Sequence, residues 1–140
     1  MSLLLLDTSA WIEFLRDTGS PACVRVHELL REDLASVVTT PPVVMELLAG
    51  GRDEGSTAAL ERLTSGLRCL DLAPATDFHA AAAAYRACRQ RGTTVRGLVD
   101  CLIAVVAQRH RAVLGHRDAD LAVLAAALGT AQQDLRPATG

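Results

Sequence analysis

The sequence contains no Lys and no Asn, and aromatic residues make up only 3% of its 140 residues. All fourteen basic residues are therefore Arg, a bias that GC-rich codon usage explains more simply than selection for guanidinium chemistry. The formal net charge is -2, which argues against a protein that coats nucleic acid through overall positive charge. Any contact with nucleic acid would have to be local.

Long apolar runs are also missing. The longest later stretch, residues 102–107, is far shorter than the roughly 20 residues of a membrane-spanning helix. The run at residues 3–6 has no basic segment before it and stops at Asp7, unlike a secretory signal peptide. We therefore expect a cytoplasmic protein that makes no membrane contact.

The cysteines are few and dispersed: Cys23, Cys69, Cys88 and Cys101. They form no C-x-x-C pair, and the sequence suggests no His at metal-ligand spacing from them, so neither a zinc site nor a redox motif is indicated. The motifs G-x-G-x-x-G, G-x-x-x-x-G-K-[ST] and H-E-x-x-H are absent as well. These absences exclude dinucleotide-binding, P-loop and zincin interpretations.

What the chain does have is an alternation of short apolar runs and helical patterns. We expect strands at residues 2–6, 34–39, 69–72 and 112–114, with a weak edge strand at 130–135. Helical patterns occur at residues 10–16, 21–30, 41–48, 57–65, 74–91, 98–110 and 120–128. Such alternation predicts a three-layer α/β/α sandwich around a central, mostly parallel sheet of four or five strands. We expect one domain over residues 1–135 and a loose tail over 136–140.

Acidic residues stand at the ends of apolar segments or just inside the helices that follow them. Asp7 leaves the first expected strand, and in an open parallel sheet ligands bind beyond the carboxyl ends of the strands. The alternative is that Asp7, Thr8 or Ser9 only caps the next helix. Glu46 lies inside a helix of Val, Met and Leu, where a carboxylate is costly unless it is paired or ligated; the alternative is a water-facing or Arg-paired side chain.

Two more acidic positions complete the pattern. Asp100 is the only acid of the most apolar helix, where the helix dipole alone would favour it by about 0.3–1 kcal/mol. Asp118 and Asp120 follow the fourth expected strand, and one of them can cap the last helix while the other enters a site. Asp118 is the first choice for chemistry, and Asp120 the second.

If these carboxylates converge, they need a cation. Two carboxylates about 4 Å apart repel by roughly 4 kcal/mol at an effective dielectric constant of 20. Oxygen ligands without His or Cys select Mg²⁺ or Mn²⁺ over Zn²⁺. Such a site typically supports phosphoryl transfer through metal-activated water, so a phosphodiester is the expected substrate.

The segments L-x-D-T-S-A-W-I, V-V-M-E-L-L-A-G, R-G-L-V-D-C-L-I-A and H-R-D-A-D together resemble a PIN domain, in particular the VapC-type toxin ribonucleases of bacterial toxin-antitoxin pairs. The resemblance spans nearly the whole chain. It implies a PIN-like fold, Mg²⁺- or Mn²⁺-dependent endoribonuclease activity, a homodimer and a small VapB-like antitoxin. It also implies catalytic roles for Asp7, Glu46, Asp100 and Asp118, with metal bound by all of these except Glu46.

Other residues enter as further candidates. Thr8 or Ser9 matches the family's hydroxyl position, and Arg96 and Arg117 are candidates for RNA binding. The chain departs from the common pattern around the fourth acid, where it has His116 and Leu121. The alternatives to a toxin are a catalytically silent PIN-like module that binds an antitoxin or RNA, and a metal-dependent phosphatase or DNA nuclease on the same site.

Overall fold

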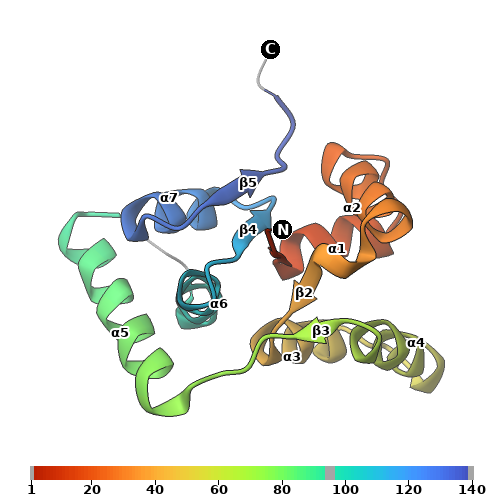
Figure 1. Cartoon of the computed structure of the whole chain (residues 1–140), viewed down its shortest axis with the longest axis horizontal. Helices are drawn as coiled ribbons and strands as arrows, with labels where there is room; N and C mark the ends of the chain where they lie inside the picture. Colours follow the sequence, from red (N-terminus) through yellow and green to blue (C-terminus); the bar gives the residue numbers. More distant parts are fainter. Residues whose placement is uncertain (1, 94–96, 139–140) are drawn as a thin grey trace.

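The computed structural model describes residues 2–93 and 97–138, and a parallel sheet lies at the centre of this part (Figure 1). The strand order is β3-β2-β1-β4-β5, and every neighbouring pair is parallel. The strands are β1 Leu4–Leu6, β2 Val37–Thr39, β3 Arg68–Cys69, β4 Val113–His116 and β5 Gln132–Asp134. The predicted parallel α/β architecture is confirmed, including the edge strand near residue 130.

Seven α-helices flank the sheet within the described residues. They are α1 Thr8–Leu15, α2 Pro21–Glu32, α3 Pro41–Ala49, α4 Glu54–Ser65, α5 Pro74–Gln90, α6 Leu98–Arg109 and α7 Ala119–Leu128. In Figure 1, α5, α6 and α7 lie on one side of the sheet and α1 and α2 on the other, with α3 and α4 near β3. Three of the helices begin with Pro, whose fixed φ and missing N–H suit the first helical position.

Three element boundaries differ from the sequence expectation by three residues, and the other differences are smaller. The first half of the expected strand at 34–39 is a 3-10 turn, Leu34–Ser36, closed by the N–H and hydroxyl of Ser36 donating to the carbonyl of Asp33. Strand β3 lies at Arg68–Cys69 instead of 69–72. Helix α4 starts at Glu54 instead of residue 57, because Asp53 and Ser56 form a reciprocal capping box.

The core explains how the strand ends are held together. Leu5, Leu6 and Leu114 are fully buried between the helical layers. Gly115 of β4 pairs with Leu6, and a Cβ atom at Gly115 would lie 2.8 Å from Leu6 Cδ2. A residue without a side chain is thus needed where β4 and β1 approach. This approach places the residues that follow β1 and β4 next to each other.

Within the described residues, no helix has both the length and the apolar character needed to cross a membrane.

Candidate metal centre

Asp7 directly follows β1 and is the N-cap of α1. Its Oδ2 accepts a hydrogen bond from the backbone N–H of Ser9 at 2.9 Å, so the capping alternative is correct for this oxygen. The residue is only 3% exposed, and Oδ1 is buried without a hydrogen-bond partner among the residues that the structure describes. Burial raises the pKa of Asp7, hydrogen bonds from Ser9 and Thr8 oppose the shift, and the charge of Asp118 adds to it. A buried oxygen without a donor is costly, and a cation would satisfy it.

Glu46 reaches the same region from α3. Its Oε1 accepts a hydrogen bond from the hydroxyl of Thr8 at 2.8 Å, across 38 residues of sequence. Burial raises the pKa of Glu46, the Thr8 hydrogen bond opposes this, and the charge of Asp7 raises it further. Among the described residues, Glu46 is therefore paired with a hydroxyl next to Asp7 and not with an Arg, the pairing that was the alternative from the sequence.

Asp118 follows β4, caps α7 and lies near the other acids. Its Oδ1 caps α7 by accepting from the N–H groups of Asp120 at 2.7 Å and Leu121 at 3.3 Å. Its charge also acts on Asp7 and Asp100. Asp120 lies in the first turn of α7 and acts on Asp100 more weakly than Asp118 does.

Asp100 lies in the first turn of α6 and is the electrostatic centre of the group. Burial, followed by the charges of Asp7, Asp118, Glu46 and Asp120, raises its pKa to about 7. Burial is the largest cause, and the added effect of four other carboxylates shows that these groups lie near Asp100. The four acids predicted from the sequence are therefore brought to one region, at the carboxyl ends of β2, β1 and β4 and at the start of α6.

His116 supports this site and does not enter it. Its Nδ1 accepts from the backbone N–H of Asp118 at 3.2 Å, which leaves Nε2–H to donate to Oε1 of Gln132 at 2.8 Å. Gln132 Nε2 in turn donates to the carbonyl of Ala122. The fully buried imidazole thus fixes the backbone of Asp118. No signal in the sequence indicated that Gln132, on the edge strand, would be its partner.

Comparison with known proteins agrees with this geometry. Residues 4–127 match the family model described as PIN domain. A protein named VapC ribonuclease Mb1587 from Mycobacterium bovis is 50% identical over 123 residues, covering 88% of this chain and 92% of the relative. Ribonuclease VapC11 from Mycobacterium tuberculosis matches with the same identity and coverage.

The chain belongs to the PIN-domain family.

A solved structure supports the same fold for this PIN domain. It is described as DNA bound VapBC from Salmonella typhimurium, and it matches with a TM-score of 0.76 at 21% identity, covering 96% of this chain and 99% of the solved chain. At this identity the likeness is evidence for the fold alone.

Three further candidates were predicted for this PIN domain: Ser9, Arg117 and Arg96. The hydroxyl of Ser9 accepts from the backbone N–H of Arg117 at 2.9 Å, and thus connects the start of α1 to the end of β4. The Arg117 guanidinium lies 3.6 Å from Glu13 Oε2 and is 37% exposed. Arg96 lies outside the described residues.

The carboxylate oxygens of the four acids are not packed as closely as the ligands of a fully coordinated metal ion. In the described part of the chain, three ligand atoms within 4.8 Å of one another occur at Asp17, Cys23 and His27, not among the four acids. Mg²⁺ usually keeps several water ligands and takes only one or two carboxylates directly. The looser acid group therefore fits a hydrated hard cation.

The inference from the sequence that no cysteine has a suitably spaced His was wrong, because Cys23 and His27 share α2.

A groove adjoins the acids. It has a volume of about 700 Å³, and Thr8 and Glu46 form part of its lining. Most of its remaining wall is apolar and comes from α1, α3 and α4, with the side chains of Ile12, Phe14, Leu15, Leu47, Leu60 and Leu63. Glu46 therefore lies between the acidic site and an apolar surface.

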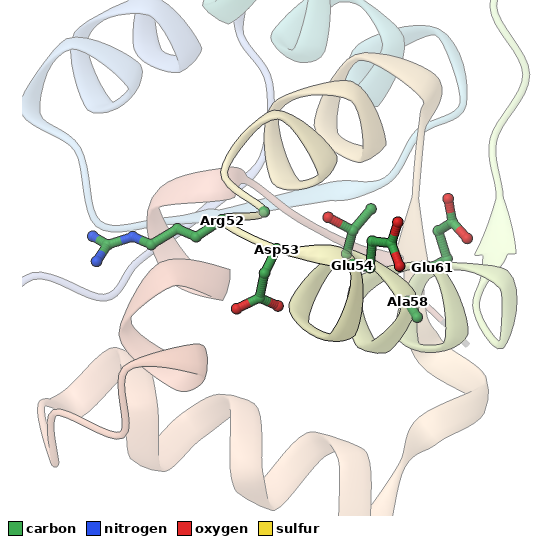
Figure 2. Close-up of a pocket in the computed structure, with 7 residues that line it drawn as sticks. Arg52, Asp53, Glu54, Ala58 and Glu61 are labelled. Atoms are coloured by element: carbon green, nitrogen blue, oxygen red, sulfur yellow. The ribbon is translucent and has the colours of Figure 1, made fainter.

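A second hollow, shown in Figure 2, lies at the start of α4 and measures about 440 Å³. Its lining includes Arg52, Asp53 and Glu61, and none of the four predicted acids. Asp53 is already engaged, because its Oδ1 accepts from the N–H of Ser56 at 2.7 Å. We assign this hollow no catalytic role.

The pKa of Asp100 predicts a pH-dependent stability. A carboxyl whose pKa is raised on folding contributes stability that is fully present below its ordinary pKa of 3.8 and is lost as the pH rises through about 7. In chelator, the contribution of Asp100 to the wild-type melting temperature should therefore fall between about pH 4 and about pH 7 and level off above that. Asp100→Asn should show a smaller fall, measured by thermal unfolding with circular dichroism. An equal fall in both proteins would contradict this origin of the pH dependence.

Proposed function

We propose that this protein is a metal-dependent endoribonuclease and the toxin of a VapBC-type toxin-antitoxin pair. The 50% identity to proteins named as VapC ribonucleases supports the reaction class. The single observation that carries the metal dependence is the buried Oδ1 of Asp7, which has no hydrogen-bond partner among the described residues. It is supported by Asp100, whose pKa is raised by burial and by the charges of the other carboxylates.

Asp7, Asp100 and Asp118 would hold the ion, and oxygen ligands favour Mg²⁺ or Mn²⁺. When bound, such an ion activates water and neutralises charge on a phosphodiester. The chain's own contribution is to keep these oxygens in place: Ser9 N–H orients Asp7, and the N–H groups at the start of α7 orient Asp118. The oxygen of Asp118 that does not cap α7 is the one assigned to the ion.

Glu46 is assigned the role of general base for the attacking water. Thr8 holds Oε1, which leaves Oε2 to accept a proton from the attacking water. The raised pKa of Glu46 suits this role, because a general base works best when its pKa approaches the working pH. Arg117, connected through its backbone to Ser9, would position an RNA phosphate beside the acids. Arg96 stays a prediction for the same role.

The proposed partners are RNA, a small VapB-like antitoxin and a second copy of the chain. The apolar groove that ends at Thr8 and Glu46 supports an antitoxin segment that covers the site, because a groove with an apolar wall fits an amphipathic helix. The cytoplasm is the proposed place of action, because the proposed RNA substrate would be met there.

A side-by-side assay tests this function. The purified protein is incubated with RNA, DNA and a small phosphate ester, each with Mn²⁺, Mg²⁺ or chelator. We expect cleavage of RNA alone, dependent on the metal. Hydrolysis of DNA or of the ester would favour the nuclease or phosphatase alternative. Binding of Mn²⁺ or RNA without any cleavage would favour a silent binding module.

The choice between Asp118 and Asp120 is tested by two matched variants. Asp118→Asn keeps the oxygen that caps α7 but removes the charge that acts on Asp7 and Asp100. We expect it to weaken Mn²⁺ binding by about tenfold or more, and Asp120→Asn to weaken it less, as measured by calorimetric titration. If Asp120→Asn weakens Mn²⁺ binding more than Asp118→Asn does, Asp120 and not Asp118 is the metal ligand.

A further inference from the structure

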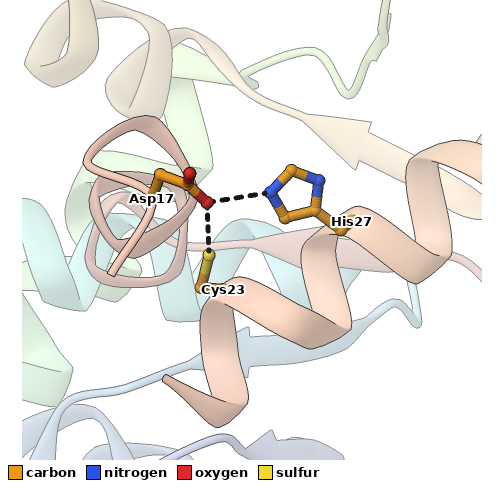
Figure 3. A group of neighbouring side chains, drawn as sticks. All are labelled: Asp17, Cys23 and His27. Atoms are coloured by element: carbon orange, nitrogen blue, oxygen red, sulfur yellow. Dashed lines mark hydrogen bonds and ion pairs between the residues drawn. The ribbon is translucent and has the colours of Figure 1, made fainter. Parts of the chain in front are cut away.

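A second group of metal-ligating side chains lies at the turn between α1 and α2, apart from the acids. Asp17 Oδ1 is 3.6 Å from His27 Nε2 and 3.8 Å from Cys23 Sγ. Figure 3 shows the three side chains pointing toward one another, with Cys23 and His27 on α2 and Asp17 on the preceding turn. They bring one sulfur, one nitrogen and one oxygen together.

Local structure explains why these side chains meet. Cys23 and His27 are four residues apart on a helix and therefore share one face. Ser20 caps α2 by accepting from the N–H of Cys23 at 3.2 Å, which fixes the first helical turn. Asp17 has a φ of 49°, a left-handed conformation that Asp adopts more readily than most residues. This conformation ends α1 and brings the carboxylate to α2.

The distances fit those of a bound transition-metal ion. Tetrahedral zinc with Zn–S of about 2.3 Å, Zn–N of about 2.0 Å and Zn–O of about 2.1 Å places S and O about 3.6 Å apart and N and O about 3.4 Å apart. The observed separations of 3.8 Å and 3.6 Å exceed these by about 0.2 Å. These two pairs would therefore need little rearrangement on ligation, and the Cys23 and His27 ligand atoms lie within 4.8 Å of each other.

The surroundings are suited to binding from solvent. Cys23 is buried, whereas the side chains of His27 and Asp17 are 49% and 84% exposed, so the oxygen and nitrogen ligands are open to an arriving ion. Phe14 packs against the His27 ring with centroids 4.7 Å apart. This contact limits the orientations of the imidazole, and such support of a ligand strengthens metal binding.

We propose that Asp17, Cys23 and His27 form a site for Zn²⁺ or a similar borderline-soft divalent ion, with water in the fourth position. Thiolate and imidazole ligands select such metals, whereas the oxygen-only acids select Mg²⁺ or Mn²⁺. The two sites therefore differ in metal preference. An ion here would connect the end of α1 to α2 and stabilise the fold, because it binds the native chain.

Co²⁺ titration of the full chain tests the site. The protein is stripped with chelator and titrated with Co²⁺ in excess Mg²⁺, while the visible bands of tetrahedral Co²⁺ and the thiolate-to-cobalt charge-transfer band are recorded. We expect both signals from wild type, their removal by Zn²⁺, and a rise in melting temperature with Zn²⁺. Asp17→Asn, which keeps a side chain suited to positive φ, and Cys23→Ser should each weaken binding more than about tenfold.

Two controls separate this site from others in the chain. Cys69→Ser removes an exposed thiol elsewhere and should leave the charge-transfer band unchanged. Asp7→Asn alters the acidic site and should leave it unchanged as well. The proposal is overturned if wild type shows no charge-transfer band at saturating Co²⁺, if Asp17→Asn binds as tightly as wild type, or if Cys69→Ser abolishes the band. Circular dichroism checks that each variant is folded.

Discussion

Replacing Asp7 by Asn is expected to reduce metal-dependent RNA cleavage by about a thousandfold or more. The substitution keeps an oxygen that can cap α1 but removes the negative charge from a carboxylate that is 3% exposed and has a buried oxygen without a partner among the described residues. A neutral amide cannot replace a charged ligand to a hard cation. The measurement is single-turnover cleavage of a labelled RNA over a range of Mn²⁺ concentrations.

Asp33→Asn is the matched control for this change. Asp33 is exposed, and its side chain makes no hydrogen bond or ion pair in the part of the chain that the structure describes. Its removal alters the net charge by the same amount and should leave cleavage within about twofold of wild type, since isolated surface charges contribute little. Unchanged cleavage by a folded Asp7→Asn would refute the metal-site assignment, and an equal loss in Asp33→Asn would attribute the effect to net charge.

The sequence predicted most of the fold because its signals are local. A continuous apolar run such as Leu4–Leu6, ended by Asp7, indicates a buried strand and its carboxyl end without knowledge of its neighbours. The ends of parallel strands meet at one edge, so the convergence of Asp7, Glu46 and Asp118 could be expected. The shift of β3 to Arg68–Cys69 could not be expected from the sequence, because these exposed residues carry no periodic pattern of apolar side chains.

Side-chain contacts between distant segments also could not be predicted from the sequence. His116 and Gln132 are each unremarkable in their own segments, and only the parallel pairing of β4 and β5 brings them together. Asp17 meets Cys23 and His27 because of a left-handed residue after α1, which a sequence containing Asp-Thr-Gly does not specify. Side-chain networks depend on tertiary placement, whereas strands and helices depend mainly on local pattern.

A half-buried ion pair between distant segments could not be predicted from the sequence either, and its removal has the largest expected effect on stability. Arg109 of α6 donates through Nε to Asp77 Oδ1 at 2.9 Å and through Nη2 to Oδ2 at 3.0 Å, across 32 residues. Asp77 Oδ2 also accepts from the N–H of Ala73 at 2.8 Å, at the start of α5. Burial alone would raise the pKa of Asp77, but the hydrogen bonds and charge of Arg109, with the Ala73 bond, hold it below its usual value.

Arg109→Ala should lower the free energy of unfolding by about 2–4 kcal/mol, because it leaves a buried carboxylate without its cation, whereas water can partly replace the exposed part of the Arg. The Asp77 side chain is 2% exposed and Arg109 is 35% exposed, so removing the Arg is more costly than Asp77→Asn, after which the guanidinium can still reach water. The measurement is urea unfolding followed by circular dichroism at neutral pH, where Asp77 is charged.

Arg136→Ala provides the matched control, since Arg136 makes the same type of bidentate contact with Asp134, but both side chains are at least one-third exposed. Its cost should stay below about 1 kcal/mol. The double variant Asp77→Asn with Arg109→Ala should be less destabilised than the sum of its single changes, because the two groups are directly coupled. If Arg109→Ala costs no more than Arg136→Ala, the pair does not hold α5 against α6, and the packing of α6 between α5 and α7 alone must do so.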